Sequence, residues 1–301
     1  MCDERVFANH DEFLRQADSG TLTRREFGVL SAGVGLAALW PEAAEAGSAT
    51  LEVVGEEVVI PTPDGQAECP FVRPTRGQHA GVLLWPDAFG LRPTMRAMGR
   101  RLATSGYSVL VVNPYYRKTK APFLPEGASF QDPPTRARIM AMMATLSAAT
   151  HAADAKSFVD WLDAQPSVDR ARRIGTMGYC MGGAITLRTA AARPDRIGAA
   201  ASFHGGRLVT AEADSPHKSI PKTKAEFLVA IASDDDAQEP HVKGVLREAF
   251  EANGLAAEVE VYEGALHGWC PPDMPVYDEE KAERAWSRML ALYGHALKAK
   301  A

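Results

Sequence analysis

One cysteine of this 301-residue chain lies in a pattern that could present it as a nucleophile. Residues 178–183 read Gly-Tyr-Cys-Met-Gly-Gly, and apolar residues stand on both sides of them. This predicts a short strand, a sharp turn centred on Cys180, and a helix. Glycines would let strand and helix approach closely while the turn residue takes a strained backbone conformation. The alternative is a buried structural cysteine beside a glycine-rich helix start, because free cysteine is often a small core residue.

An acid and a histidine follow this cysteine in the order that a nucleophilic triad requires. The apolar run 227–232 breaks into Ser-Asp-Asp-Asp at 233–236, and His267 follows the strand-like run 257–262. Both positions are carboxyl ends of expected strands, which meet at one edge of a parallel sheet. There a carboxylate can orient an imidazole that removes the proton from the Cys180 thiol. Taken alone, His267 could equally be a structural histidine.

Alternating apolar and helical segments are expected to position these residues. The expected strands lie near 51–60, 80–86, 107–113, 172–178, 197–203, 226–232 and 257–262, and the helices near 92–105, 149–165, 181–193, 240–253 and 279–298. This alternation predicts an α/β fold, a mostly parallel sheet with helices on both faces. Residues 115–133 are expected to form a loop, and residues 134–148 a helix over the active-site edge.

These motifs together carry a family resemblance over residues 50–298. The cysteine turn, the strand-end aspartate, Gly-Ala-Leu-His-Gly-Trp at 264–269 and Leu-Leu-Trp-Pro-Asp-Ala-Phe-Gly-Leu-Arg at 83–92 resemble the dienelactone hydrolase family. The resemblance implies an α/β-hydrolase fold and hydrolysis of lactones or esters through an acyl-enzyme. It assigns Cys180 as nucleophile, Asp235 as acid and His267 as base. Asp235 stands third after Ala232, where the family has Gly-x-x-Asp, and Asp234 and Asp236 remain alternatives.

The resemblance also implies a carboxylate that governs the charge state of the thiol. Asp87 stands where the founding pattern has glutamate, one methylene longer; alternatively, Asp87 caps the helix expected at 92–105. The backbone N–H groups of Ala88 and Met181 are the expected oxyanion hole, because one lies in the loop after the strand expected at 80–86 and the other follows the nucleophile.

The substrate pocket is less well defined by the sequence. Arg136, His204 and Trp269 are candidates to contact substrate, although a solvated arginine and two packed rings are ordinary alternatives. The family places an arginine just beyond the catalytic histidine, and residues 268–273 contain none. A small lactone or ester is therefore expected in preference to a true dienelactone. No phosphate loop, dinucleotide fingerprint or metal-ligand spacing occurs in the sequence, so neither a cofactor nor a metal is expected.

The N-terminal residues resemble a twin-arginine export signal. Arg24 and Arg25 precede the mildly apolar run 29–40, and Ala-Glu-Ala at 44–46 forms a small-residue cleavage site. The apolar run is too short to span a bilayer. The sequence thus predicts a signal over residues 1–46 and one periplasmic or extracellular domain over 47–301 without stable membrane insertion. An uncleaved amphipathic tail is the alternative.

Charge and cysteine content complete the expectations. Without residues 1–46 the chain is nearly neutral, which argues against a nucleic-acid partner. The expected partner is a small-molecule lactone or ester; the sequence does not give the oligomeric state, for which a monomer is the expectation. Cys180 must remain a free thiol, whereas Cys69 and Cys270 could pair in an oxidising compartment. A hydrolase-fold protein that binds ligands or exchanges thiols without hydrolytic turnover remains the alternative function.

Overall fold

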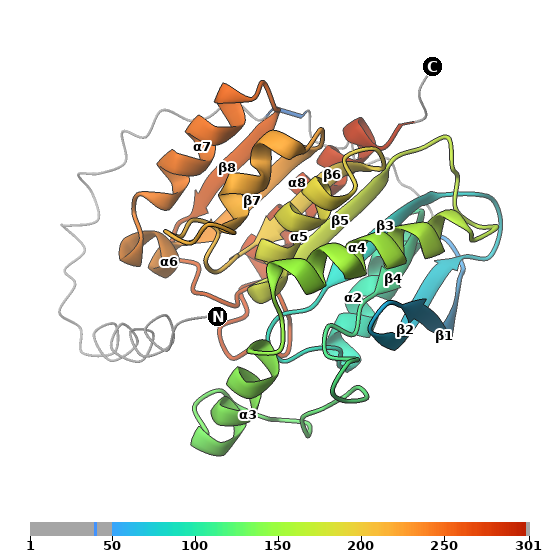
Figure 1. Ribbon diagram of the computed structural model, residues 1–301, viewed down its shortest axis with the longest axis horizontal. Coiled ribbons are helices and arrows are strands. Elements are labelled where there is room, and N and C mark those ends of the chain that lie inside the picture. The colour runs from blue at the N-terminus through green and yellow to red at the C-terminus, as the bar shows by residue number, and fades with distance from the viewer. Residues whose placement is uncertain (1–38, 41–49, 299–301) are drawn as a thin grey trace.

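The computed structural model describes residues 39–40 and 50–298, which form an α/β structure around one sheet (Figure 1). Its strands are β1 (Val53–Thr62), β2 (Gly65–Pro74), β3 (Ala80–Trp85), β4 (Tyr107–Val111), β5 (Ile174–Tyr179), β6 (Ile197–Phe203), β7 (Glu226–Ala232) and β8 (Ala257–Tyr262). Their order in the sheet is β1-β2-β4-β3-β5-β6-β7-β8. All pairs from β4 to β8 are parallel, whereas β2 pairs antiparallel with both β1 and β4.

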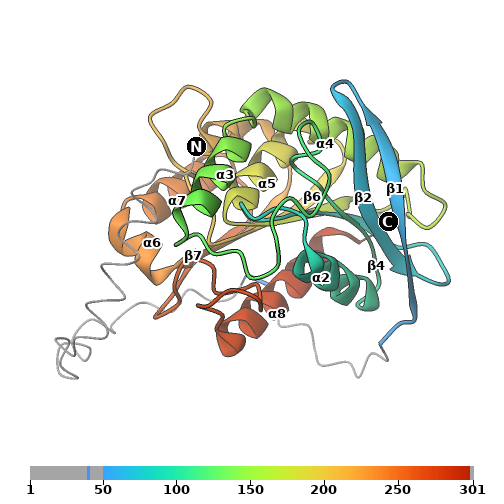
Figure 2. The same ribbon diagram turned by 90° about the horizontal axis from the view of Figure 1, so that it is seen from below.

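Helices cover both faces of this sheet, as the sequence predicted (Figure 2). One face packs against α2 (Pro93–Thr104) and α8 (Glu279–Ala296). The other face packs against α4 (Ala148–Asp163), α5 (Met181–Ala192) and α7 (Val242–Ala252). The central parallel strands are buried on both faces, so they read as continuous apolar runs rather than as alternating ones. No helix in the described ranges is both long and apolar enough to cross a membrane.

Three local elements differ from the sequence prediction. Residues 65–74 were not predicted as a strand, yet β2 pairs with β1 along its full length. The short helix α6 (Ser233–Gln238) occupies the acidic run, where no helix was predicted, with its acids in the first turn, where the helix dipole favours them. Helix α3 (Pro133–Met143) is shorter than expected, because Ser147 begins α4 with a capping box.

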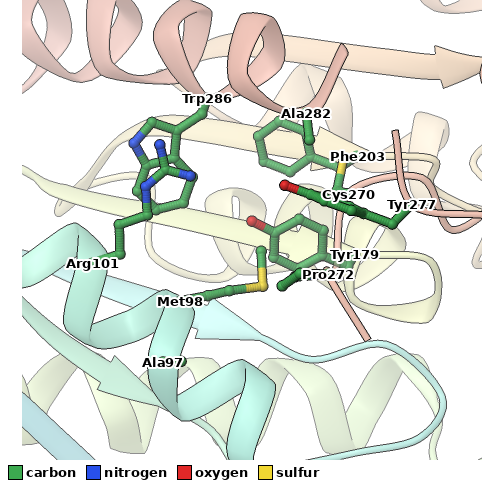
Figure 3. A pocket seen from close by; sticks show the side chains of 10 residues that line it. All are labelled: Ala97, Met98, Arg101, Tyr179, Phe203, Cys270, Pro272, Tyr277, Ala282 and Trp286. Atoms are coloured by element: carbon green, nitrogen blue, oxygen red, sulfur yellow. The ribbon is translucent and has the colours of Figure 1, made fainter. Parts of the chain in front are cut away.

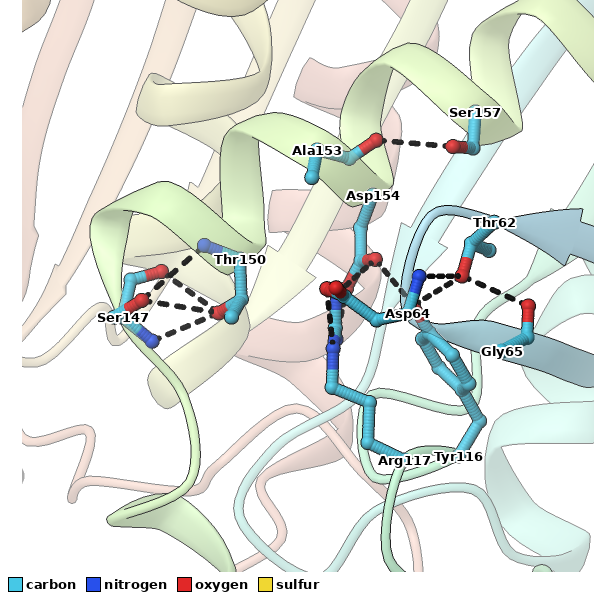
Figure 4. A network of polar contacts seen from close by, with 10 residues as sticks. All are labelled: Thr62, Asp64, Gly65, Tyr116, Arg117, Ser147, Thr150, Ala153, Asp154 and Ser157. Atoms are coloured by element: carbon cyan, nitrogen blue, oxygen red, sulfur yellow. Dashed lines mark hydrogen bonds and ion pairs between the residues drawn. The ribbon is translucent and has the colours of Figure 1, made fainter.

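Polar contacts hold the long loop between β4 and α3 against the β1–β2 hairpin and α4 (Figure 4). Arg117 pairs with Asp64 and with Asp154, each at 2.7 Å. The Tyr116 hydroxyl donates to Asp154 at 2.8 Å and also bonds the Thr62 hydroxyl at 2.7 Å. The edge hairpin is thereby fixed to the loop that continues toward the sheet's carboxyl edge.

Trp40 packs into the domain although it belongs to the segment predicted to be a signal. Its side chain is 2% exposed, and its Nε1–H donates to Glu226 at 2.7 Å. Its carbonyl accepts a bond from Arg288 at 2.9 Å. Both predicted signal motifs, the arginine pair and the cleavage site, lie outside the described residues.

Candidate active site

Cys180 lies in a sharp turn between β5 and α5. Its backbone has φ 51° and ψ −114°, a conformation that L-residues other than glycine rarely adopt. A Cβ on Gly178 would lie 2.2 Å from the Gly182 carbonyl oxygen, and a Cβ on Gly182 would lie 2.4 Å from the Trp85 carbonyl oxygen. Since both clashes are with backbone, the turn requires glycine at these positions. The glycine pattern in the sequence therefore reflects direct contact between β5, α5 and the end of β3.

Four polar residues follow four neighbouring strands. Cys180 follows β5, His204 follows β6, Asp235 lies in α6 directly after β7, and His267 lies in the loop after β8. Because these strands are parallel and adjacent, their carboxyl ends form one row, and the four residues lie along it.

The three consecutive aspartates make different contacts. Asp235 accepts from the His267 imidazole, with Nδ1 to Oδ2 at 2.8 Å and to Oδ1 at 3.0 Å. Asp234 is 3% exposed and accepts the backbone N–H of His267 at 2.9 Å. Asp236 pairs instead with Lys243 of α7 at 2.6 Å. Asp235 thus orients the imidazole ring, Asp234 fixes the backbone that carries it, and Asp236 belongs to a different contact.

His204 and Trp269 lie behind His267, buried in the structure. The His204 ring meets the His267 ring edge to face with centroids 5.0 Å apart, and meets Trp269 at 5.2 Å. Exposed fractions are 1% for His204 and 0% for Trp269. Burial, with a smaller contribution from His267, holds the pKa of His204 well below its usual value, so its ring is neutral. Of these two predicted substrate contacts, His204 therefore supports the His267 ring in this structure and Trp269 packs behind His204, while Arg136 lies on α3.

Asp87 takes part in a buried cluster of charges. Arg92 donates to both oxygens of Asp87, at 2.7 and 2.9 Å, and to both oxygens of Asp273, at 2.6 and 2.9 Å. Although burial opposes its charge, the two aspartates raise the pKa of Arg92 above its usual value. The helix-cap alternative for Asp87 is wrong: Arg92 is the N-cap residue of α2, and Asp87 instead accepts from the Phe89 N–H at 2.9 Å.

Arg92 is the residue near this site whose role sequence reasoning missed. It brings a guanidinium to the loop after His267 from the start of α2, and not from that loop itself. The available signal was weak, consisting of an aspartate five positions earlier and another beyond His267.

Ala88 and Met181, the expected oxyanion donors, come from segments that pack together. A Cβ on Gly182 would also lie 2.7 Å from the Pro86 carbonyl oxygen, so the start of α5 touches the loop after β3. The Tyr115 hydroxyl lies 2.9 Å from the Ala88 carbonyl oxygen and 3.4 Å from the Met181 sulfur. As the first residue of α5, Met181 lies at the positive end of the helix dipole.

No disulfide joins Cys69, Cys180 and Cys270 within the part of the chain that the structure describes. Cys69 lies in the core beneath α4 and α5, whereas Cys270 lies in the core on the α2 and α8 side. The pairing of Cys69 with Cys270 that the sequence left open is therefore absent between these described residues. Burial raises the pKa of Cys69 to about 12 and raises that of Cys270 as well.

Comparison with known proteins places this fold and site in a family. A mostly parallel sheet, a strained turn at Cys180 and a histidine after the last strand define an α/β-hydrolase. The family model "Dienelactone hydrolase family" matches residues 69–297, and the chain belongs to that family. Accordingly, it is a hydrolase that acts on ester or lactone bonds.

Individual relatives agree with this assignment. A Salmonella typhi protein named "Putative carboxymethylenebutenolidase" is 27% identical over 243 residues, covering 78% of this chain and 86% of the relative. A Methylorubrum extorquens protein of the same name is 26% identical over 276 residues, covering 89% and 91%. The solved structure named "Putative Dienelactone Hydrolase" from Klebsiella pneumoniae has a TM-score of 0.71 at 25% identity, covering 81% of this chain and 99% of the other.

Proposed function

We propose that this protein hydrolyses small esters or lactones through a Cys180–His267–Asp235 triad and an acyl-enzyme. The observation that carries the proposal is the hydrogen bond of 2.8 Å between His267 Nδ1 and Asp235. Asp235 follows β7, which lies two strands from β5 and the strained turn of Cys180. With Nδ1–H donated to Asp235, the other ring nitrogen, Nε2, is the base.

The reaction proceeds in two balanced halves. His267 Nε2 removes the thiol proton, and the Cys180 thiolate attacks the substrate carbonyl carbon. The negative charge that develops on the carbonyl oxygen is stabilised by the N–H groups of Ala88 and Met181. The C–O bond then breaks, and His267 returns the proton to the departing oxygen. Water, deprotonated by His267, attacks the thioester, and the acid leaves as Cys180 regains its proton. With a lactone, the departing oxygen stays attached to the acyl group, and one hydroxy acid is released.

We assign the activation of the thiol to His267 and a holding role to Asp87. Both Asp87 oxygens are bound by Arg92, which limits direct contact of this carboxylate with the thiol. The Arg92 charge is in turn shared by two carboxylates and is not available to a substrate carboxylate. This arrangement supports a neutral substrate. The proposed reaction needs only a monomer and one small-molecule substrate.

The test compares turnover of wild type and variants on p-nitrophenyl acetate and on paired lactones with and without a carboxylate. Cys180→Ala should abolish turnover, and mass spectrometry of wild type should find the acyl group on Cys180. Asp235→Asn should lower kcat by about 10²–10⁴, and Asp236→Asn, its matched control, should change it little. Full activity in Cys180→Ala would contradict the triad. An intact, unreactive thiol across the panel would favour the ligand-binding or thiol-exchange alternative.

We further propose export through a twin-arginine signal over residues 1–46. The sequence motif supports it, whereas the burial of Trp40 means that cleavage after Ala46 removes a contact with Glu226 and Arg288. The mass of the protein recovered from the periplasmic fraction decides between a start near Gly47 and an uncleaved chain. Arg24→Lys with Arg25→Lys should leave the protein in the cytoplasm. Unchanged export of this double variant would contradict the proposal.

A further inference from the structure

A cavity of about 150 Å³ lies between α2 and α8 at the carboxyl edge of the sheet (Figure 3). Its walls include Met98 and Arg101 from α2, Trp286 from α8, Tyr179 at the end of β5, and Cys270 and Tyr277 from the segment between β8 and α8. Cys180, Asp235 and His267 are not among its lining residues. The cavity is therefore separate from the site proposed for hydrolysis.

The hydroxyl of one tyrosine with a buried ring reaches this cavity. Tyr179 is 1% exposed, and its hydroxyl points into the space between α2 and the segment that carries Cys270 (Figure 3). Its ring is stacked on Phe203 with centroids 5.1 Å apart, so it has little freedom to turn elsewhere. Within the described ranges the Tyr179 hydroxyl makes no hydrogen bond. A hydroxyl that makes no bond to the protein is available to a ligand in the cavity, with which it can exchange a hydrogen bond.

The walls indicate the chemistry of that ligand. Arg101 lies over the Trp286 ring at 4.3 Å and pairs with Glu283, so its charge is already satisfied. The rings of Tyr179, Phe203, Tyr277 and Trp286 supply most of the remaining wall, together with sulfur and methyl groups. Such a surface disfavours a charged ligand, since a buried ion needs a partner. A cavity of this volume with apolar walls holds a benzene-sized molecule in another protein.

We propose that this cavity is a binding site for a small neutral aromatic molecule that carries one hydroxyl group, of the size of phenol. The ring lies among the aromatic walls, and its hydroxyl exchanges a hydrogen bond with the Tyr179 hydroxyl. The site is independent of the hydrolysis proposed above, so either can fail without the other.

Calorimetric titration with phenol and with toluene tests the proposal, using the full chain with Cys180→Ala to prevent covalent chemistry. Phenol has seven heavy atoms, and a ligand of this size should bind with a Kd on the order of 1 mM. Tyr179→Phe removes the hydroxyl but keeps the ring. It should weaken phenol about tenfold, the usual effect of one hydrogen bond, and leave toluene unchanged. No saturable binding of phenol, or an equal loss for both ligands, would overturn the proposal.

A second pair of variants locates the ligand. Ala282 lines the cavity near the start of α8, and Ala282→Phe should fill the space and abolish binding of both ligands. Ala252 is an exposed residue at the end of α7, and Ala252→Phe is the matched control that should bind as before. Retained phenol binding in a folded Ala282→Phe protein, checked by its thermal melt, would place the ligand elsewhere and refute the site.

Discussion

Removing the Arg92 guanidinium should destabilise this protein far more than removing an exposed arginine from the same helix. Arg92 is 13% exposed in its side chain and holds Asp87, which is 5% exposed, and Asp273, which is 36% exposed. Arg92→Met keeps the length and apolar stem of the side chain but leaves both carboxylates without their cation. Asp87 then remains buried with only the Phe89 N–H as its donor among the contacts described above, and a buried charge without its cation is unfavourable.

The expected magnitude follows from burial. Breaking a buried ion pair by removing one partner costs about 3–5 kcal/mol. Asp273 is partly solvated, so the lower end of this range, about 3 kcal/mol, applies to the cluster as a whole. For a domain of this size that loss corresponds to a fall in Tm of roughly 6–12 °C. The rate kcat should fall as well, because Arg92 holds the loop that carries Ala88 against the loop that follows His267.

Urea unfolding of wild type, Arg92→Met and Arg96→Met measures the difference. Arg96 lies one turn further along α2 and pairs with Glu57, but the two side chains are 36% and 59% exposed. An exposed pair contributes about 0–1 kcal/mol, so Arg96→Met should be nearly neutral. Equal losses in the two variants would refute the reasoning, because the Asp87–Arg92–Asp273 cluster would then contribute no more than a surface pair.

Three further outcomes are expected. Gly182→Ala should lower the free energy of unfolding by about 3 kcal/mol or more, since its Cβ would meet backbone. Gly244→Ala, which has open space around it in α7, should raise the free energy of unfolding by about 0.5–1 kcal/mol in the same urea experiments. Equal effects would contradict the close packing of the turn. His204→Phe should keep most of kcat, while His204→Ala should lower kcat roughly tenfold by releasing the His267 ring. Equal losses of kcat would mean that the reaction depends on the His204 nitrogens and not on the contacts of its ring. Burial alone would raise the pKa of Asp273, but Arg92 lowers it below the ordinary 3.8. The ionised carboxylate therefore stabilises the fold above pH 3.8, and this contribution is lost as the pH falls through the lowered pKa. The free energy of unfolding measured against acid pH should change less in Arg92→Met than in wild type, and an unchanged pH dependence would argue against this coupling.

The central part of the fold could be predicted because its strands are buried on both faces. Runs such as 80–85 and 226–232 are apolar throughout, and helical segments separate them at regular intervals. β2 escaped prediction for the opposite reason. It lies between β1 and β4, carries Pro70 and Pro74, and buries only part of its length, so no simple period marks it. α6 escaped prediction because three adjacent acids show no apolar helical period. They are favoured in this helix because they lie in its first turn, where the helix dipole attracts negative charge.

The same distinction explains which parts of the site the sequence could predict. Cys180, Asp235 and His267 each come just after a strand, and β5 to β8 are neighbours in the sheet in the order in which they occur in the chain. Sequence order then maps directly onto spatial order, and a motif search finds the residues that meet. The Arg92–Asp273 contact joins residues 181 positions apart, from opposite sides of β5 in the sheet.

That contact depends on how α2 packs against the segment between β8 and α8, which no local pattern encodes. The family resemblance implies an arginine just after His267, and its absence from residues 268–273 favoured a small lactone or ester over a true dienelactone. In the structure a guanidinium reaches the same loop from the start of α2 and is held there by Asp273, while its other face holds Asp87. Since the same charge can arrive from a different element, its absence at one sequence position says little about the electrostatics of the site. In this chain Arg92 already pairs with two aspartates, and this pairing, which no local motif encodes, supports the neutral substrate proposed above.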